Sequence, residues 1–190
     1  MLPLDARRLV LRRFAETDAA AFLAYRNDPE IARYQGWEGC GVKESAEFVR
    51  RHAVQRFGVP GEWLQIAITL KTTGELIGDC AVRIHADDVR QATIGVTLAR
   101  AHHGQGFASE ALSCLFEYLF RQQALHRVVA DTDAENTAMQ KLAERLGMRR
   151  EGHSRQSLWF KGRWADECFY AILRDEWLAE PGLHRVTSRR

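Results

Sequence analysis

The sequence predicts a mixed α/β (α+β) fold in which about four helices flank a largely antiparallel central sheet of about six to seven strands. Runs of alternating apolar residues, typical of strands, follow one another between residues 64 and 98. A glycine-containing segment then leads into residues 108–119, whose apolar side chains recur at helical spacing. A further helical stretch at 136–146 precedes two more strand-like runs. No internal repeat or low-complexity segment interrupts this order.

The first expected elements are a short strand and two helices. Val10 to Phe14 is strand-like, and a helix is expected from Asp18 to Asn27, because the following Asp28-Pro29 disfavours helical backbone. Glu44 to Phe57 is predicted as the second helix. These elements precede the main part of the sheet.

The middle of the chain predicts an antiparallel meander. Leu64 to Leu70 and Leu76 to Ile84 each alternate, and Lys71 to Gly74 between them supplies a turn, so the two runs form a hairpin. Ala92 to Leu98 follows the polar turn at residues 87–90 as a third strand. The meander then continues into the glycine-containing segment and its helix.

The last part of the chain predicts one more helix and three strands. A strand is expected at His126 to Ala130, followed by a helix from Asn136 to Leu146 that ends at Gly147. Two late strands are expected around Glu151 to Trp159 and Trp164 to Leu173.

Composition predicts one domain without a membrane segment. A chain of 190 residues, 46% hydrophobic and 27% charged, can bury one core, and no Pro/Ser-rich linker divides it. We therefore expect a single domain at residues 1–180 and a disordered basic tail at 181–190. A net charge of +2 is too small to indicate a nucleic-acid or membrane partner. With no signal-peptide h-region and no apolar run near the ~20 residues of a membrane span, a cytoplasmic location is expected.

The cysteines indicate no metal site. Cys40, Cys80, Cys114 and Cys168 are widely spaced, without C-x-x-C spacing or neighbouring histidine pairs. Neither zinc nor a disulfide framework is therefore expected, and no metal enters the predicted chemistry.

The segment from His103 to Ala108, HGQGFA, suits a bound phosphate. Gly104 and Gly106 place no Cβ in a ligand's way, and the free N–H groups of the first helical turn favour anions. The segment lacks the lysine and hydroxyl of a G-x-x-x-x-G-K-[ST] loop. It is not G-x-G-x-x-G either, because Ser109 stands where the third glycine would fall. A third type of phosphate-binding loop remains.

This loop resembles the [QR]-G-x-G-x-[GA] loop of the GNAT superfamily of N-acetyltransferases, with His103 in place of the usual Gln or Arg. Asn136-Thr137-Ala138 with residues 142–148 is similar to the family's N-x-x-S…E-K-L-G-F helix. Segments near both ends are similar to the Rim-type ribosomal-protein N-acetyltransferases, and the resemblance covers roughly residues 5 to 178. These segments are Arg8 to Arg12 with Asp18, Asn27-Asp28-Pro29, Trp37, Phe160 to Asp166 and Tyr170 to Trp177.

The resemblance implies acetyl-CoA as co-substrate. Loop amides would hold its pyrophosphate, and the backbone of the preceding strand would pair with the pantetheine arm, which enters through a splay toward the next strand. The implied cofactor-binding residues are Val96, Leu98, His103, Gly104, Gln105, Gly106, Phe107, Ala108 and Asn136. From the residues alone, Val96 and Leu98 also suit core packing, and Asn136 suits a helix N-cap.

The expected reaction is direct attack of a primary amine on the acetyl-CoA carbonyl in a ternary complex. Many Rim-type relatives carry an acidic residue where this chain has Thr93, and a serine where it has Met139. Threonine is no base at neutral pH, and a thioether cannot donate a proton. Glu38 and Asp131 are weak candidates for a replacement base, with solvated carboxylates as the alternative. An α-amine of pKa near 8 needs a base less than a lysine does.

Two functions from different classes remain open on the sequence. The first is an acetyl-CoA-dependent N-acetyltransferase whose acceptor is a protein N-terminal α-amine or a small-molecule amine. The second is a non-catalytic acyl-CoA-binding regulatory module. The acceptor pocket is expected from residues 33–41 and 152–163, and a homodimer is left open. An aromatic set either lines that pocket or packs in the core, and its members are Tyr34, Trp37, Trp159 and Trp164.

Overall fold

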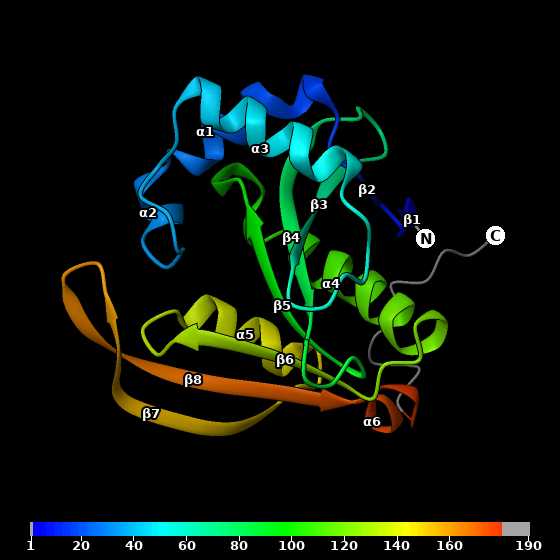
Figure 1. Cartoon of the computed structure of the whole chain (residues 1–190), viewed down its shortest axis with the longest axis vertical. Helices are drawn as coiled ribbons and strands as arrows, with labels where there is room; N and C mark the ends of the chain where they lie inside the picture. The colour runs from blue at the N-terminus through cyan, green and yellow to red at the C-terminus, as the bar shows by residue number, and fades with distance from the viewer. Residues whose placement is uncertain (1, 180–190) are drawn as a thin grey trace.

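The central feature of the fold is one eight-stranded sheet with the order β1-β2-β3-β4-β5-β6-β8-β7 (Figure 1). The molecule is described from a computed structural model over residues 2–179. The strands are β1 (Leu4–Asp5), β2 (Leu9–Arg12), β3 (Trp63–Leu70), β4 (Leu76–Ile84), β5 (Gln91–Leu98), β6 (Arg127–Asp133), β7 (Arg149–Phe160) and β8 (Arg163–Leu173). All neighbouring pairs are antiparallel except β5 with β6.

Six α-helices within residues 2–179 flank the sheet. They are α1 (Ala19–Arg26), α2 (Pro29–Ala32), α3 (Val42–Val54), α4 (Phe107–Glu117), α5 (Thr137–Arg145) and α6 (Arg174–Ala179). Helices α1 and α3 lie together near one end of the sheet, whereas α4 and α5 lie beside the strands at its middle (Figure 1). The mixed, largely antiparallel fold expected from the sequence is confirmed.

The predicted meander is confirmed, and its register follows from the alternation of apolar residues. Trp63 pairs with Arg83 and Ile66 with Cys80 in the β3–β4 hairpin, whose turn contains Gly74 at φ +72°. Strand β5 then pairs antiparallel with β4 from Leu98 opposite Gly78 to Ala92 opposite Ile84. Because side chains alternate between the two faces, one face of each strand enters the core.

The parallel contact between β5 and β6 is short. It consists of three register pairs, from Gln91 opposite Arg127 to Thr93 opposite Val129. Beyond these pairs, β5 continues to Leu98 and β6 continues to Asp133 without pairing with each other. The sheet therefore opens between these two strands.

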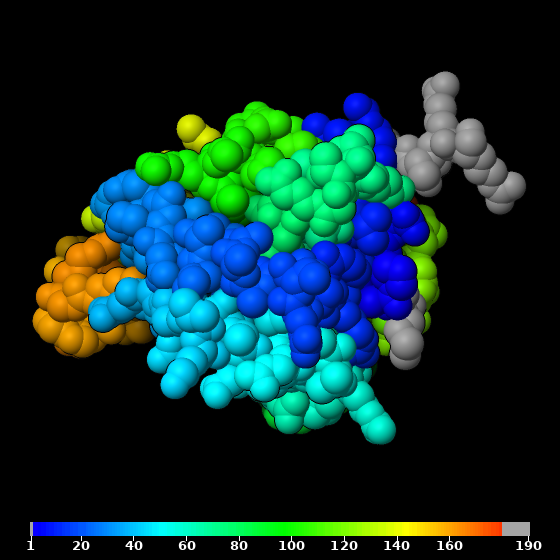
Figure 2. Space-filling view, turned by 90° about the horizontal axis from the view of Figure 1, so that it is seen from above, coloured from blue at the N-terminus to red at the C-terminus, as the bar shows by residue number. Residues whose placement is uncertain are grey.

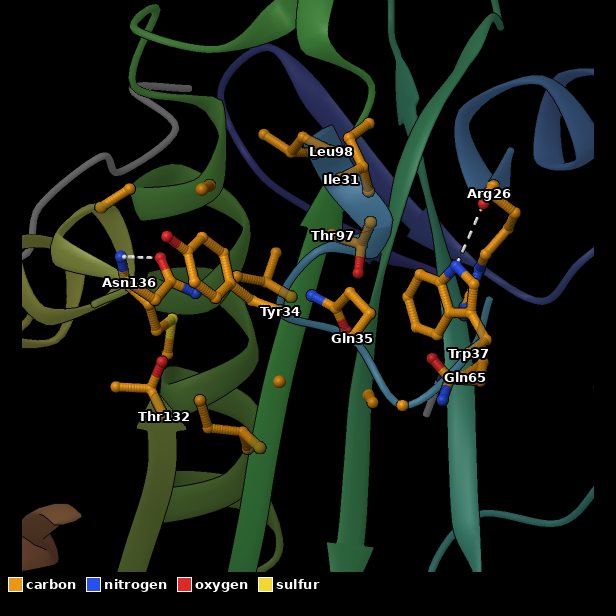
Figure 3. A pocket seen from close by; sticks show the side chains of 18 of the residues that line it. Arg26, Ile31, Tyr34, Gln35, Trp37, Gln65, Thr97, Leu98, Thr132 and Asn136 are labelled. Carbon is orange, nitrogen blue, oxygen red and sulfur yellow. Dashed lines mark hydrogen bonds between the residues drawn. The ribbon is translucent and has the colours of Figure 1, made fainter. Parts of the chain in front are cut away.

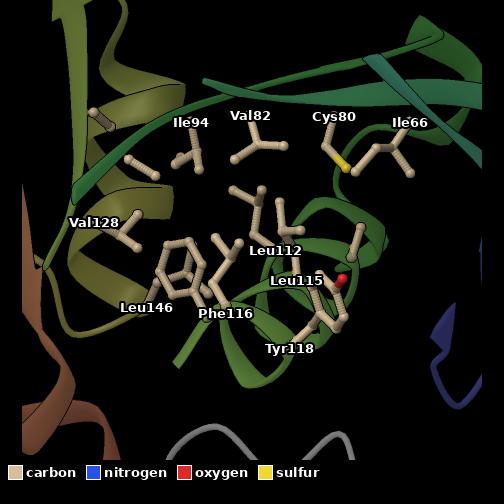
Figure 4. Packing of buried hydrophobic residues seen from close by; sticks show 14 of the residues in the cluster. Ile66, Cys80, Val82, Ile94, Leu112, Leu115, Phe116, Tyr118, Val128 and Leu146 are labelled. Atoms are coloured by element: carbon tan, nitrogen blue, oxygen red, sulfur yellow. The ribbon is translucent and has the colours of Figure 1, made fainter. Parts of the chain in front are cut away.

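The main core lies between α4 and the middle of the sheet. Figure 4 shows Leu112, Leu115 and Phe116 of α4 packed beneath sheet residues that include Val82 and Ile94. None of the three α4 residues is exposed to solvent. A second cluster, which includes Phe14, Phe22, Tyr25 and Val49, covers the other face under α1 and α3. Burial on both faces explains why β4 carries an almost continuous run of buried residues.

The structure has more elements than the six to seven strands and four helices expected. The additions are β1, α2 and α6, which span two to six residues and are too short to show a hydrophobic period. Helix α1 ends at Arg26, as the Asp28-Pro29 signal predicted. The same signal starts α2, because Pro29 occupies its first turn and the Asp28 carboxylate accepts a hydrogen bond from the Glu30 amide at 3.0 Å.

Two expectations concern the ends of the domain and the membrane. The predicted basic tail at residues 181–190 lies outside the described residues. Within residues 2–179, no helix combines the length and the apolar composition needed to cross a bilayer.

An ion pair with a buried carboxylate ties the first strands to α4. Glu110 is 1% exposed, and its carboxylate accepts hydrogen bonds from both the backbone amide and the Nε of Arg8, the latter at 2.7 Å. The Arg8 guanidinium also lies 4.2 Å from the centre of the Phe107 ring and donates to the Gln105 carbonyl. This one side chain therefore holds the start of α4 and the preceding loop against β2.

Replacing Arg8 by Met should destabilise the protein by about 2 kcal/mol, because the buried Glu110 carboxylate would lose its cation while the apolar stem is kept. Arg121→Met is the matched control. Arg121 pairs with Glu117, but both side chains are about half exposed, so its loss should cost less than about 1 kcal/mol. Urea unfolding of both variants measures the difference. Equal losses would contradict the role assigned to Arg8.

Candidate functional site

A cavity of about 1600 Å³ opens where β5 and β6 separate. Both strands line it, together with the 103–109 segment, α5, and residues of α1, α3 and the loop after α2. Because the β6-facing edge of residues 94–98 has no strand partner within the described chain, its backbone groups are available to an extended ligand.

The glycine loop presents unpaired amides to one end of this cavity. Gly104 and Gly106 have φ angles of +73° and +78°, a backbone conformation that glycine adopts without strain. In residues 2–179, the amides of residues 104–109 donate to no carbonyl or side chain, and the first bond inside α4 runs from the Glu110 amide to the Gly106 carbonyl at 3.0 Å. Such a set of free N–H groups at a helix start suits a phosphate.

Side chains of the loop hold it in this shape. The Nε2 of His103 lies 2.8 Å from the Leu98 carbonyl, and since a carbonyl only accepts, this nitrogen carries the proton. The Gln105 side-chain amide donates to the Ala101 carbonyl at 2.9 Å. Together with Arg8 on the Gln105 carbonyl, these bonds hold the loop in place.

Asn136 caps α5 and lies on the cavity wall. Its Oδ1 accepts a hydrogen bond from the Met139 amide at 3.1 Å, which confirms the predicted N-cap. Met139 lines the cavity and also packs against the main core. The cap role and a role beside a ligand are therefore compatible for Asn136.

Most of the predicted site residues come together around this cavity. Leu98 is buried in the core and Val96 packs against it, which confirms the core-packing interpretation; both also line the cavity, and their role in cofactor binding stays a prediction. Gln105 does not line it, because its side chain turns to Ala101. The predicted residues that line the cavity are Val96, Leu98, His103, Gly104, Gly106, Phe107, Ala108, Asn136 and Asp131.

The two weak candidates for a base differ in position. Asp131, two residues beyond the last β5–β6 pair, is exposed and lines the cavity. Glu38 is also exposed but is not among the lining residues. Only Asp131 is therefore placed to meet a ligand.

The loop after α2 contributes aromatic side chains to the cavity wall. Tyr34 and Gln35 lie between Asn136 and Trp37 (Figure 3), so the loop after α2 crosses the cavity. Leu158 and Phe160 of β7 add further lining, as expected for the 152–163 segment.

Trp159 and Trp164 are neither cavity-lining nor core residues, which corrects the sequence-based expectation. They are 60% and 56% exposed, and their rings meet edge to face with centroids 5.4 Å apart. They pair directly across β7 and β8, on the face opposite to the cavity-lining Leu158. Because successive side chains of a strand point to opposite faces, a shift of one residue decides which face a side chain occupies.

The tip of the β7–β8 hairpin is fastened to the cavity rim. The Lys161 ammonium donates to the carbonyls of Ala32 and Trp37, at 2.7 and 2.6 Å. Figure 2 shows the hairpin beside the segment that carries α2. The hairpin and the loop after α2 thus form one continuous rim.

Sequence reasoning missed a buried polar network under Trp37. The Arg26 guanidinium lies 3.5 Å from the Trp37 ring centre and bonds to the Asp79 carboxylate at 3.1 Å, while the Tyr25 hydroxyl donates to the other carboxylate oxygen at 2.7 Å. Burial raises the pKa of Asp79, and the charge of Arg26 lowers it part of the way back. This network supports Trp37 from below. Asp79 is 53 and 54 residues away from its two partners in the sequence, so no local sequence pattern predicts these contacts.

His52 is a second cavity-lining residue that the sequence did not single out. It is 3% exposed, its Nδ1 accepts a hydrogen bond from the Gln65 amide at 3.3 Å, and its Nε2 lies 3.4 Å from the Arg51 guanidinium. Burial, assisted by the charge of Arg51, lowers the pKa of His52 to about 4. His52 is therefore neutral at physiological pH. No group of three or more His, Cys, Asp or Glu side chains in the described part of the chain could hold a metal ion.

Comparison with known proteins identifies a family. Residues 8–149 match the model of the acetyltransferase (GNAT) domain. The chain is 32% identical over 178 residues to an uncharacterized N-acetyltransferase, p20, of Bacillus licheniformis, covering 93% of this chain and 99% of the relative.

Two further comparisons concern proteins named for ribosomal substrates. The [ribosomal protein uS5]-alanine N-acetyltransferase of Escherichia coli is 30% identical over 84 residues, 44% of this chain and 43% of that enzyme. The solved structure of RimL, a ribosomal L7/L12 alpha-N-protein acetyltransferase in complex with coenzyme A, superposes with a TM-score of 0.78 at 23% identity, covering 92% of this chain and 98% of RimL. The first match is partial, and the second shows the fold.

The low pKa of His52 should make stability depend on pH. Between about pH 6.5 and pH 4, the unfolded chain binds a proton at this histidine that the folded protein does not, so stability falls as the pH is lowered through this window. A shift from 6.5 to about 4 corresponds to ~3 kcal/mol. His52→Gln should remove up to this amount from the loss between pH 7 and pH 4, measured by urea unfolding. His126→Gln, at an exposed histidine, is the control and should keep the pH dependence of the wild-type stability. If His52→Gln also kept it, the low pKa assigned to His52 would be refuted.

Proposed function

The chain belongs to the acetyltransferase (GNAT) family and is an N-acetyltransferase, and we propose that it transfers an acetyl group from acetyl-CoA to the α-amine of a protein or peptide N-terminus. The observation that carries this proposal is the opening between β5 and β6, which ends at a loop of unpaired amides. A small-molecule amine is the second candidate acceptor. A non-catalytic regulatory module is not favoured, because this family and its relatives are named for acetyl transfer.

The residues at the loop fit the phosphates of coenzyme A. The amides of residues 104–109 are free to donate; a Cβ built at Gly104 would meet nothing within 4 Å, and one at Gly106 only the Arg8 guanidinium at 3.6 Å. The unpaired edge of Val96 to Leu98 would hydrogen-bond the amides of the pantetheine arm as an added strand does. When bound, the co-substrate supplies a thioester whose carbonyl carbon accepts the amine.

The chemistry of the wall favours an amine that loses its proton readily. Thr93 lines the cavity where Rim-type relatives carry an acid, and Met139 lines it where they carry a serine. An α-amine, with a pKa near 8, is partly neutral at pH 7, whereas a lysine side chain near 10.4 is almost fully charged. The partial similarity to an alanine N-acetyltransferase points the same way. This supports an α-amine acceptor and the Rim-type subgroup.

Further features of the proposal concern assembly and location. The exposed Trp159 and Trp164 pair offers an apolar surface that a homodimer would cover. We expect the domain to span residues 1–180 and to act in the cytoplasm, without nucleic-acid or membrane partners. Size-exclusion chromatography with light scattering of the Trp159→Ser and Trp164→Ser variants tests the dimer.

Gly106→Trp should lower affinity for acetyl-CoA by about tenfold or more, because an indole would stand beside the unpaired amides, and tenfold corresponds to 1.4 kcal/mol. Gly58→Trp is the matched control. Both glycines have positive φ, +78° and +81°. A Cβ built at Gly106 lies 3.6 Å from the Arg8 guanidinium, an ordinary contact, and one at Gly58 meets nothing within 4 Å, but Gly58 does not line the cavity. Calorimetric titration with acetyl-CoA measures binding, and thermal melting checks that both variants fold. Equal losses of affinity would place the cofactor elsewhere.

Purified protein should release coenzyme A thiol from acetyl-CoA in the presence of peptides with a free N-terminus. A peptide whose N-terminal residue is Ala or Ser is compared with its Nα-acetylated form, in which only the lysine amines remain free. Polyamines, amino acids and aminoglycosides are tested in parallel. Release with the free peptide alone would support the α-amine acceptor. Release with a small amine alone would replace it by the second candidate, and binding without any release would favour the regulatory module.

A further inference from the structure

Thr93 occupies the closed end of the opening between β5 and β6. It pairs with Val129 in the last register pair before the strands part, and it lines the cavity although its residue is only 5% exposed. The glycine loop lies beyond the other end of β5, past Leu98, five residues or ~17 Å along the strand. A ligand whose phosphates lie at the loop and whose arm follows β5 therefore brings its far end to Thr93.

The Thr93 hydroxyl has one side-chain partner in residues 2–179, the imidazole of His85. His85 Nε2 lies 2.8 Å from Thr93 Oγ1. His85 directly follows β4, whose Arg83 pairs with Thr93, so the two side chains meet diagonally on one face of the sheet. His85 is half-buried and does not line the cavity. The imidazole therefore lies between the cavity wall and solvent.

We propose that Thr93 and His85 together carry the proton of the acceptor amine from the cavity to solvent. This inference rests on the proposed acetyl transfer. Threonine alone is no base, but a hydroxyl accepts one proton while it donates its own, and an imidazole both accepts a proton and exchanges it with water near neutral pH. Thr93 is the catalytic residue here, and His85 acts through it.

The proton transfer balances as follows. The acceptor ammonium gives one proton to Thr93 Oγ1 as the Thr93 hydroxyl proton passes to His85 Nε2, so threonine is unchanged and the imidazole becomes imidazolium. The neutral amine then forms its bond to the acyl carbon as the carbon–sulfur bond breaks, the thiolate leaves with the electron pair, and the second amine proton passes to the thiolate through water, which gives the neutral amide and the thiol. The imidazolium then releases one proton to water and returns by exchange with water to the Nδ1–H tautomer before the next turnover. This route requires that Nε2 accept, so that resting His85 is the Nδ1–H tautomer.

The charged groups around the pair are mostly occupied by other partners. On β4, Arg83 lies over the Trp63 ring at 4.8 Å. In the turn before β5, Asp88 and Arg90 pair with each other at 2.8 Å. On β6, Arg127 is paired with Glu151. Within the described chain, none of these groups is hydrogen-bonded to His85 or Thr93.

Asp131 is the competing proton acceptor. It lies on the β6 wall of the same cavity, and its carboxylate has no hydrogen-bond or ion-pair partner in residues 2–179. The relay and Asp131 differ in what they predict. If Asp131 takes the proton, changes at His85 leave the pH dependence of the reaction unaltered.

The first test needs no turnover. Long-range ¹H–¹⁵N NMR spectra of the full chain, with His85→Gln used to assign the ring, should show the Nδ1–H tautomer of His85. Thr93→Val, which keeps the shape but removes the hydroxyl, should shift the Nε2 signal. A resting Nε2–H tautomer would overturn the proposal, because Nε2 could not then accept the threonine proton.

The second test is the pH profile of kcat from pH 5.5 to 9 with the acceptor found above. Thr93→Val and His85→Gln should each lower kcat at pH 7 about tenfold or more, with KM for acetyl-CoA within about twofold. The double variant should be no slower than either single one, because the two groups act as a unit. The rate of each variant should recover as the pH approaches the amine pKa.

His126→Gln is the matched control and should keep the wild-type profile, because His126 is exposed and lies outside the cavity lining. A wild-type profile in His85→Gln, together with a lost acidic limb in Asp131→Asn, would assign the proton to Asp131 and overturn the relay. Absence of turnover in the wild type would count against the proposed function, and the NMR test would then decide on the relay by itself.

Discussion

The parting of β5 and β6 after three register pairs is the constraint on which the rest of the site depends. Backbone N–H and C=O groups at a sheet edge need partners, and an edge left open inside a molecule is costly unless something else supplies them. Here β6 remains fixed by β8 along its whole length, and β5 is fixed by β4. The opening is therefore held from both outer sides, and its width is a property of the sheet.

Much of this arrangement could be predicted from the sequence because it depends on local chemistry. Alternation predicted the β3–β4–β5 meander, and Asn136 was recognised as the cap of α5. Contacts that depend on register between distant segments could not be predicted. The Arg26–Asp79 pair, the His85–Thr93 bond and the outward face of Trp159 each require knowledge of which residues lie opposite one another.

The departures from the resemblance, Thr93 and Met139, lie on the cavity wall, and the agreements lie at the glycine loop and the cap of α5. The Gly104 and Gly106 conformations and the Asn136 cap match the resemblance, and backbone groups do that work irrespective of neighbouring side chains. Proton transfer depends on side chains, so it can be reassigned by two substitutions that leave the strands intact. An imidazole, with an ordinary pKa near 6.5, is better matched to an α-amine near 8 than to a lysine near 10.4.

The Lys161 ammonium joins two parts of the cavity rim. One cation holds the carbonyls of Ala32 and Trp37, so the hairpin turn and the loop after α2 separate together or stay together. Charge-assisted bonds of this kind contribute about 1.5–3 kcal/mol each. Glu135 adds a second link, because its carboxylate pairs with Arg33 after α2 at 3.2 Å and with Arg163 of β8 at 3.3 Å. Charged side chains therefore join this part of the rim at two points, and screening by salt acts on the exposed pairs.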